Sequence, residues 1–173
     1  SHEKQRLHAL QLASLTKKKT SLLGDDRVQQ IQRRIEDIQT RVTPPAPDAI
    51  TATLRPYQLE GFHFLAYLTA NNFGGVLADD MGLGKTLQTL AWIAWLRTDK
   101  SVTEPILVVC PKSVQDNWQT ECLKFFPDLK VEVWNRANSD SKKVKTQADL
   151  LVINYVQLRN NEEMLYSSTW GAV

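Results

Sequence analysis

The chain has 173 residues, enough for one domain of ordinary size and a short additional segment. Hydrophobic residues make up 42% and charged residues 23%, ordinary values for a soluble globular protein that exclude a wholly disordered, collagen-like or coiled-coil chain. The formal net charge is +2, and the basic excess lies in residues 1–45, which carry 9 basic and 5 acidic groups.

Residues 1–43 are expected to form a helical accessory segment. Five apolar residues recur there at alternating spacings of three and four, which places them on one stripe of a helix: Val28, Ile31, Ile35, Ile38 and Val42. Gly24 separates this helix from an earlier leucine-rich stretch, so the pattern predicts a helical hairpin. Two heptads are fewer than a coiled coil requires, which favours docking within the molecule over pairing with a partner helix.

Residues 44–52 are expected to be a proline-rich linker. The run Thr43-Pro44-Pro45-Ala46-Pro47 cannot continue a helix, because proline has no backbone N–H and pushes the preceding residue out of the helical region. We therefore place a domain boundary here and treat residues 53–173 as the second domain.

Beyond the linker, helical and strand patterns alternate. The expected helices cover about residues 56–70, 85–97, 114–126 and 157–166, and the expected strands cover 75–78, 106–110, 131–134 and 150–153. Short apolar strands separated by helices of ten or more residues are typical of βαβ units. The sequence therefore predicts an α/β fold with a mostly parallel sheet covered on both faces.

The strongest chemical signal is the segment 75–86, in which an apolar run leads into a glycine-containing loop and then into a helix. Polyphosphate binding needs inward-pointing backbone N–H groups, a helix N-terminus, an ammonium group and a hydroxyl group for Mg²⁺. Gly82 and Gly84 let the backbone approach phosphates without a Cβ clash, Lys85 supplies the ammonium and Thr86 the hydroxyl. The alternative is a glycine-rich turn without any phosphate function. In that case the sequence Gly-Lys-Thr would stand at the start of a helix by chance alone.

Residues 79–86, Asp-Asp-Met-Gly-Leu-Gly-Lys-Thr, closely resemble the phosphate loop of the Swi/Snf-type ATPases of helicase superfamily two, although the general P-loop pattern has glycine where Asp79 stands. The resemblance implies ATP and Mg²⁺ as cofactors, with Lys85 and Thr86 as catalytic residues and Thr86 as a metal ligand. It also implies nucleotide contacts from Asp80, Met81, Gly82, Leu83, Gly84, Lys85 and Thr86.

Residues 54–62 resemble the adenine-reading segment of the same family, in which Gln58 contacts the adenine edge. A glutamine on an amphipathic helix is otherwise usually a surface residue. Its position ahead of the phosphate loop favours the adenine role.

Two later segments, 106–113 and 151–155, resemble the family's motifs that approach the nucleic acid backbone. The resemblance implies contacts from Lys112, Ser113, Asn154 and Tyr155, although the family usually has threonine or serine where Asn154 stands. A lysine and a serine after a strand can instead simply cap the following helix.

Hydrolysis in this family also needs a strand ending in Asp-Glu and arginines from a second lobe. The acidic pairs 25–26, 36–37 and 162–163 do not follow an apolar strand of four residues, the pair 79–80 belongs to the phosphate loop itself, and residues 169–173 resemble the approach to such a strand. We therefore expect the front of a first RecA-like lobe, with the acidic box beyond Val173, the second lobe outside the chain, and no hydrolysis by the chain alone.

The resemblance covers residues 53–173 and implies a RecA-like P-loop lobe of a helicase-like hydrolase. Its activity would be ATP hydrolysis coupled to translocation along double-stranded DNA, gripped through its phosphates, in chromatin or protein–DNA remodelling. Two alternatives stay open: an RNA-directed ATPase of the same superfamily, and a nucleotide-binding or partner-binding module without motor activity.

No segment predicts membrane insertion or export. The longest apolar run, 90–96, is far shorter than the roughly 20 residues of a membrane helix, and the first twenty residues lack a signal-peptide core. Cys110 and Cys122 have neither the spacing of a zinc site nor the number of a disulfide framework, which indicates a reducing compartment. We expect an intracellular protein without a membrane partner, cytoplasmic in a bacterium and nuclear in a eukaryote.

Overall fold

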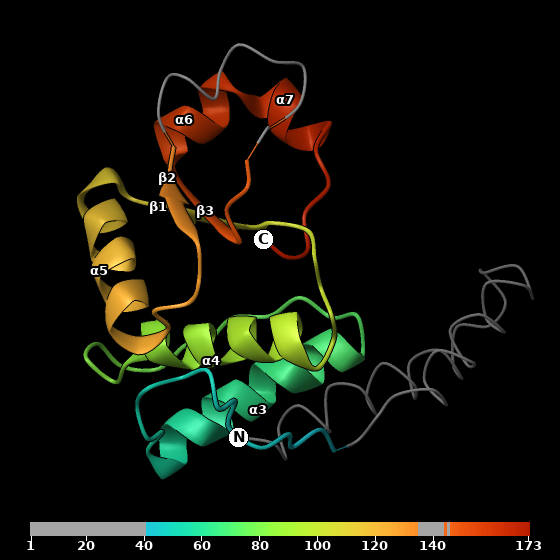
Figure 1. The fold of residues 1–173 in the computed structure, drawn as a ribbon, viewed down its shortest axis with the longest axis vertical. Coiled ribbons are helices and arrows are strands. Elements are labelled where there is room, and N and C mark those ends of the chain that lie inside the picture. The colour runs from blue at the N-terminus through green and yellow to red at the C-terminus, as the bar shows by residue number, and fades with distance from the viewer. Residues whose placement is uncertain (1–40, 135–143, 145) are drawn as a thin grey trace, which may run out of the picture. The chain divides into compact units, whose positions relative to one another are not determined.

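The computed structural model describes residues 41–134, 144 and 146–173 (Figure 1). The predicted N-terminal hairpin, and with it the prediction that it docks on the lobe, lies outside these residues. Contacts divide the chain into two compact units, Thr43–Ala66 with Gly75–Val173, and Ser1–Val42 with Tyr67–Gly74. The side chains described below belong to the first of these units.

The core of this unit is a parallel sheet of three strands, β1 (Ile106–Cys110), β2 (Val131–Val133) and β3 (Leu150–Asn154), in the order β1-β3-β2. Every residue of β3 is buried, as expected for a continuous apolar run at the centre of a parallel sheet. The backbone N–H of Leu107 donates to the carbonyl of Ala172, so the segment around Ala172 runs parallel to β1 along its other edge.

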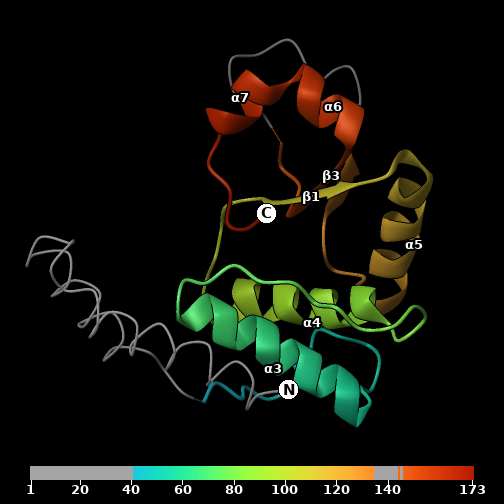
Figure 2. The same ribbon diagram turned by 180° about the vertical axis from the view of Figure 1, so that it is seen from behind.

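Six helical segments accompany the sheet within the described ranges: α3 (Pro56–Ala70), α4 (Lys85–Thr98), the 3-10 turn η1 (Lys112–Val114), α5 (Gln115–Phe125), α6 (Tyr155–Asn160) and α7 (Glu162–Tyr166). Figures 1 and 2 both show the sheet between α4 on one side and the pair α6 and α7 on the other. The predicted coverage of both faces is therefore confirmed for this unit.

Apolar packing holds these layers together. Phe62 of α3 is fully buried, and its ring meets Trp95 of α4 edge-on at a centroid distance of 6.4 Å. On the other side of the sheet, one buried cluster joins strand residues to α7: Leu107, Trp134, Leu151, Ile153, Met164 and Leu165. Burial of such side chains contributes about 1.5–3 kcal/mol each, which makes these contacts the main support of the layers.

The predicted strand 75–78 is wrong, because this segment has no regular secondary structure. A strand exists only where its backbone groups pair with a neighbouring strand, and among the described residues no strand pairs with this segment. Val76 is accordingly 80% exposed. The apolar run therefore approaches the phosphate loop as an extended segment.

The predicted helix 157–166 is also wrong in its bounds, because it is divided into α6 and α7. The first of these begins at Tyr155, where Asn154 accepts hydrogen bonds from the N–H groups of Val156 and Gln157 in a capping box. The division falls at Asn161, whose backbone φ of −127° departs from the helical value.

Residues 44–52, the predicted linker, form no helix and pack on the domain. The N–H and the hydroxyl of Thr51 donate to the carbonyls of Phe125 and Lys124 at the end of α5, and Ile50 is buried. The linker is thus a fixed part of this unit.

Candidate nucleotide site and nucleic acid loops

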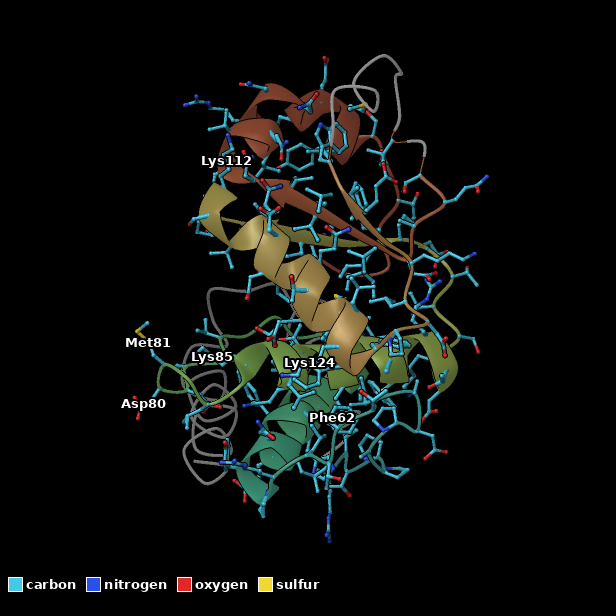
Figure 3. All side chains as sticks on the ribbon, turned by 60° about the vertical axis from the view of Figure 1, so that its left-hand side comes forward. Phe62, Asp80, Met81, Lys85, Lys112 and Lys124 are labelled. Atoms are coloured by element: carbon cyan, nitrogen blue, oxygen red, sulfur yellow. The ribbon has the colours of Figure 1, made fainter. Side chains whose placement is uncertain are left out.

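The phosphate loop, residues 79–84, leads directly into α4. Gly82 has a φ of +84° and Gly84 a φ of +74°, both in the left-handed region that favours glycine. A Cβ atom at Gly84 would lie 2.5 Å from Nε2 of Gln58. Asp80 and Met81 project outward at the tip of the loop (Figure 3), and Met81 is 97% exposed.

The ammonium group of Lys85, the first residue of α4, lies within this loop. Its Nζ donates to the carbonyl oxygens of Asp79 and Asp80 at 2.9 and 2.8 Å. Thr86 follows in the first helical turn and is half-buried. No side chain caps the α4 N-terminus, and its first turn holds no acidic residue, so its N–H groups and the positive end of its dipole can receive an anion.

Gln58, the predicted adenine residue, lies on the first turn of α3 and is brought against the phosphate loop. Its Nε2 donates to the carbonyl of Leu83 at 3.3 Å, and its Oε1 accepts the N–H of Arg55 at 3.0 Å. The structure therefore places the predicted adenine-reading residue beside the predicted phosphate-binding residues, and its adenine contact stays a prediction.

Gln88 is a residue of this site that sequence reasoning missed. It is fully buried on α4, and its Nε2 donates to Oδ2 of Asp79 at 3.0 Å and to the carbonyl of Leu83 at 3.4 Å. The sequence did carry a signal, because Gln88 is a polar residue between Leu87 and Leu90, on a helix that is otherwise apolar enough to be buried.

The predicted nucleic acid residues come from two neighbouring loops. Lys112 and Ser113 are exposed in η1 after β1, and Tyr155 is 60% exposed at the start of α6 after β3. Cys110 at the end of β1 pairs with Asn154 at the end of β3, so both loops leave the sheet at the same edge. Their contacts with nucleic acid stay predictions.

Asn154 differs from these exposed residues because it is buried, with an exposed fraction of 8%. Its Oδ1 accepts the N–H groups of Val156 and Gln157, each at 3.0 Å, and its Nδ2 donates to Oε1 of Gln115 at 3.0 Å. Gln115 in turn donates to the carbonyl of Val152 and to Oε1 of Gln157. The Asn154 amide is thus occupied within the fold, and its predicted nucleic acid contact stays untested.

We expect Asn154→Ala to destabilise the domain. It removes a helix cap worth about 1 kcal/mol and leaves Oε1 of the buried Gln115 without a donor, at a cost of about 1–3 kcal/mol. Asn154→Ser keeps a capping hydroxyl and should lose less. Urea unfolding measures both, with the exposed Asn117→Ala on α5 as a control, and equal stability of all three variants would contradict this role.

The two cysteines offer no catalytic thiolate. Both are free and buried. Burial, with a smaller contribution from the charge of Glu121, raises the pKa of the Cys122 thiol to about 12, and burial also raises the pKa of Cys110. Over the described ranges, no group of three His, Cys, Asp or Glu side chains could hold a metal ion, and no helix is long and apolar enough to cross a membrane.

Residues 57–173 match the SNF2-related domain. The chain belongs to this family. It is 36% identical to the TATA-binding protein-associated factor mot1 of Aspergillus fumigatus, over 87% of this chain and 9% of that protein. It is also 36% identical to the ISWI chromatin-remodeling complex ATPase ISW2 of Saccharomyces cerevisiae, over 68% of this chain and 11% of that protein. The Helicase SWR1 of Cryptococcus neoformans is 47% identical over 62% of this chain and 8% of its own length.

A solved SNF2 structure has the same fold. The Sulfolobus solfataricus SWI2/SNF2 ATPase core in complex with dsDNA matches 69% of this chain and 25% of its own length, with a TM-score of 0.61 and 39% identity. The predicted family and the RecA-like α/β fold are therefore confirmed. The chain spans about a tenth of the length of these curated SNF2 relatives.

Proposed function

We propose that this chain is the ATP-binding part of a DNA-dependent ATPase of SNF2 type. The observation that carries the proposal is the phosphate loop, in which two left-handed glycines and the Lys85 ammonium precede an uncapped helix N-terminus. This combination of N–H groups, helix dipole and cation suits a polyphosphate.

Different residues of the site bind different parts of ATP. The loop N–H groups around Gly82 and Gly84 receive the phosphates, and Lys85 moves from the loop carbonyls to the β and γ phosphates, whose charge it neutralises. Gln58 reads the adenine edge. The Thr86 hydroxyl, in the first helical turn, is a hard oxygen of the kind that would hold Mg²⁺. A Mg²⁺ ion held there would offset phosphate charge.

The loops after β1 and β3 present Lys112, Ser113 and Tyr155 to the nucleic acid backbone. Contacts to phosphates carry little sequence information, so the grip would suit translocation along double-stranded DNA and remodelling of protein–DNA complexes. Turnover needs a second RecA-like lobe. The relatives named for chromatin or transcription are eukaryotic, which favours a nuclear location if this chain is eukaryotic.

The alternatives can be separated by binding measurements on the 173-residue chain with labelled duplex DNA, single-stranded DNA and duplex RNA at several salt concentrations. The proposal expects a preference for duplex DNA and an affinity that falls with salt. A preference for RNA would favour the RNA-directed ATPase. ATP binding without any nucleic acid binding would favour a nucleotide-binding module.

Gln58→Ala is expected to bring the affinities for ATP and GTP closer together. The substitution removes the amide that would pair with the adenine edge, at a cost of about 1–3 kcal/mol to ATP binding. Because the same amide supports Leu83, some affinity for both nucleotides should also be lost. Competition binding measures the ratio of the ATP and GTP affinities directly. An unchanged preference for ATP would count against the adenine role of Gln58.

A further inference from the structure

We propose that Asp79 and Gln88 form a positioning pair that holds the phosphate loop in its nucleotide-binding shape. This inference rests on the proposed function of the loop and assigns a role to two residues within it. The general P-loop pattern has glycine where Asp79 stands, and the contacts of Asp79 give a physical reason for the side chain found there instead.

The pair closes the loop from its first residue to its penultimate one. Nε2 of Gln88 reaches Oδ2 of Asp79 at 3.0 Å, where the loop begins, and the Leu83 carbonyl at 3.4 Å, just before α4. Since Gln88 is fully buried in the second turn of α4, it ties both positions of the loop to one point on that helix.

The position of the Lys85 ammonium depends on the same loop residues. The carbonyls of Asp79 and Asp80 accept its hydrogen bonds, so any displacement of Asp79 also displaces an acceptor of Lys85. The pair therefore sets the geometry from which Lys85 turns toward phosphates. Gln88 acts through Asp79 and Leu83, and it is a positioning residue.

The burial of Gln88 indicates that its positioning role lowers the folding stability of the domain. Its side chain is fully buried, and among the described residues its Oε1 has no hydrogen-bond partner. A buried acceptor without a donor is unfavourable, and leucine would fill this apolar helix face without that cost. Folding stability alone therefore does not explain why the side chain at position 88 is an amide.

Gly61 of α3 leaves room for the end of the Gln88 side chain. A Cβ atom at Gly61 would lie 1.7 Å from Oε1 of Gln88, so the helix offers a glycine surface where the oxygen packs. With the oxygen facing α3, the NH₂ group faces the loop. The glycine at position 61 thereby permits the close approach of α3 and α4 that leaves the amide beside Asp79.

The test is the ATP affinity of the 173-residue chain, measured by calorimetry with Mg²⁺ present. Gln88→Glu places two carboxyl groups about 3 Å apart, so we expect at least a roughly tenfold loss of affinity, relieved as pH falls and one carboxyl gains a proton. Asp79→Asn alone keeps an amide oxygen as acceptor for Gln88 and should lose less affinity than Gln88→Glu. The double variant Asp79→Asn/Gln88→Glu has an amide donor facing a carboxylate and should recover the part of the loss that comes from the two facing carboxyl groups, although the donor to the Leu83 carbonyl is still missing.

Two further variants serve as controls. Gln119→Glu, on the exposed side of α5, makes the same charge change and should leave ATP affinity unaltered. Gln88→Leu should melt at the same temperature as the parent chain or higher, yet bind ATP more weakly, which a purely structural role would not produce. Equal losses from Gln88→Glu alone and from the double variant, or full affinity of Gln88→Leu, would overturn the pair. Absence of ATP binding by the parent chain would instead overturn the proposed function.

Discussion

Lys85→Ala should weaken ATP binding by about ten- to a hundredfold while leaving the melting temperature nearly unchanged. Charge-assisted hydrogen bonds contribute about 1.5–3 kcal/mol, and this substitution removes the only ammonium proposed for the β and γ phosphates. The two carbonyls that Lys85 contacts lie in an exposed loop where water can replace it, and no core volume is lost.

Calorimetric titration with ATP and a thermal melt on the same sample separate an effect on ATP binding from an effect on folding stability. Lys130→Ala removes the same charge from an exposed position before β2 and serves as the control. Full ATP affinity in Lys85→Ala would refute the assignment of the phosphate loop, whereas a large fall in melting temperature would show that Lys85 also supports the fold.

The 173-residue chain by itself is expected to hydrolyse ATP no faster than the uncatalysed reaction. None of the strands described in the structure ends in an acidic pair, and an arginine finger of the kind a second lobe supplies is typically worth about 10³ to 10⁵ in rate. Asp79 is engaged by Gln88, while Glu162 and Glu163 begin α7. Binding should therefore occur without turnover.

Phosphate release with and without duplex DNA measures this directly. The Sulfolobus solfataricus SWI2/SNF2 ATPase core, which was solved with dsDNA, is a suitable positive control. DNA-stimulated release by the 173-residue chain would show that catalytic carboxylates are already present within it. Asp80, which is exposed at the loop tip, would then be the first candidate to replace.

The sequence by itself determined the features that depend on neighbouring residues. The helix Pro56–Ala70 and the strand Ile106–Cys110 have the predicted bounds, because apolar periodicity and flanking breakers are local signals. The phosphate loop was also readable, since its glycines, lysine and threonine lie within five consecutive residues. The parallel sheet followed from the alternation of strands and helices.

Only the tertiary structure decided what depends on distant residues. The order β1-β3-β2 and the burial of Asn154 on Gln115 join segments that no periodicity links. The contact of Gln88 with Gly61 joins two helices whose approach is set by packing around Phe62. A hydrogen bond needs its atoms within about 3 Å, and across such separations only the packed fold brings them together.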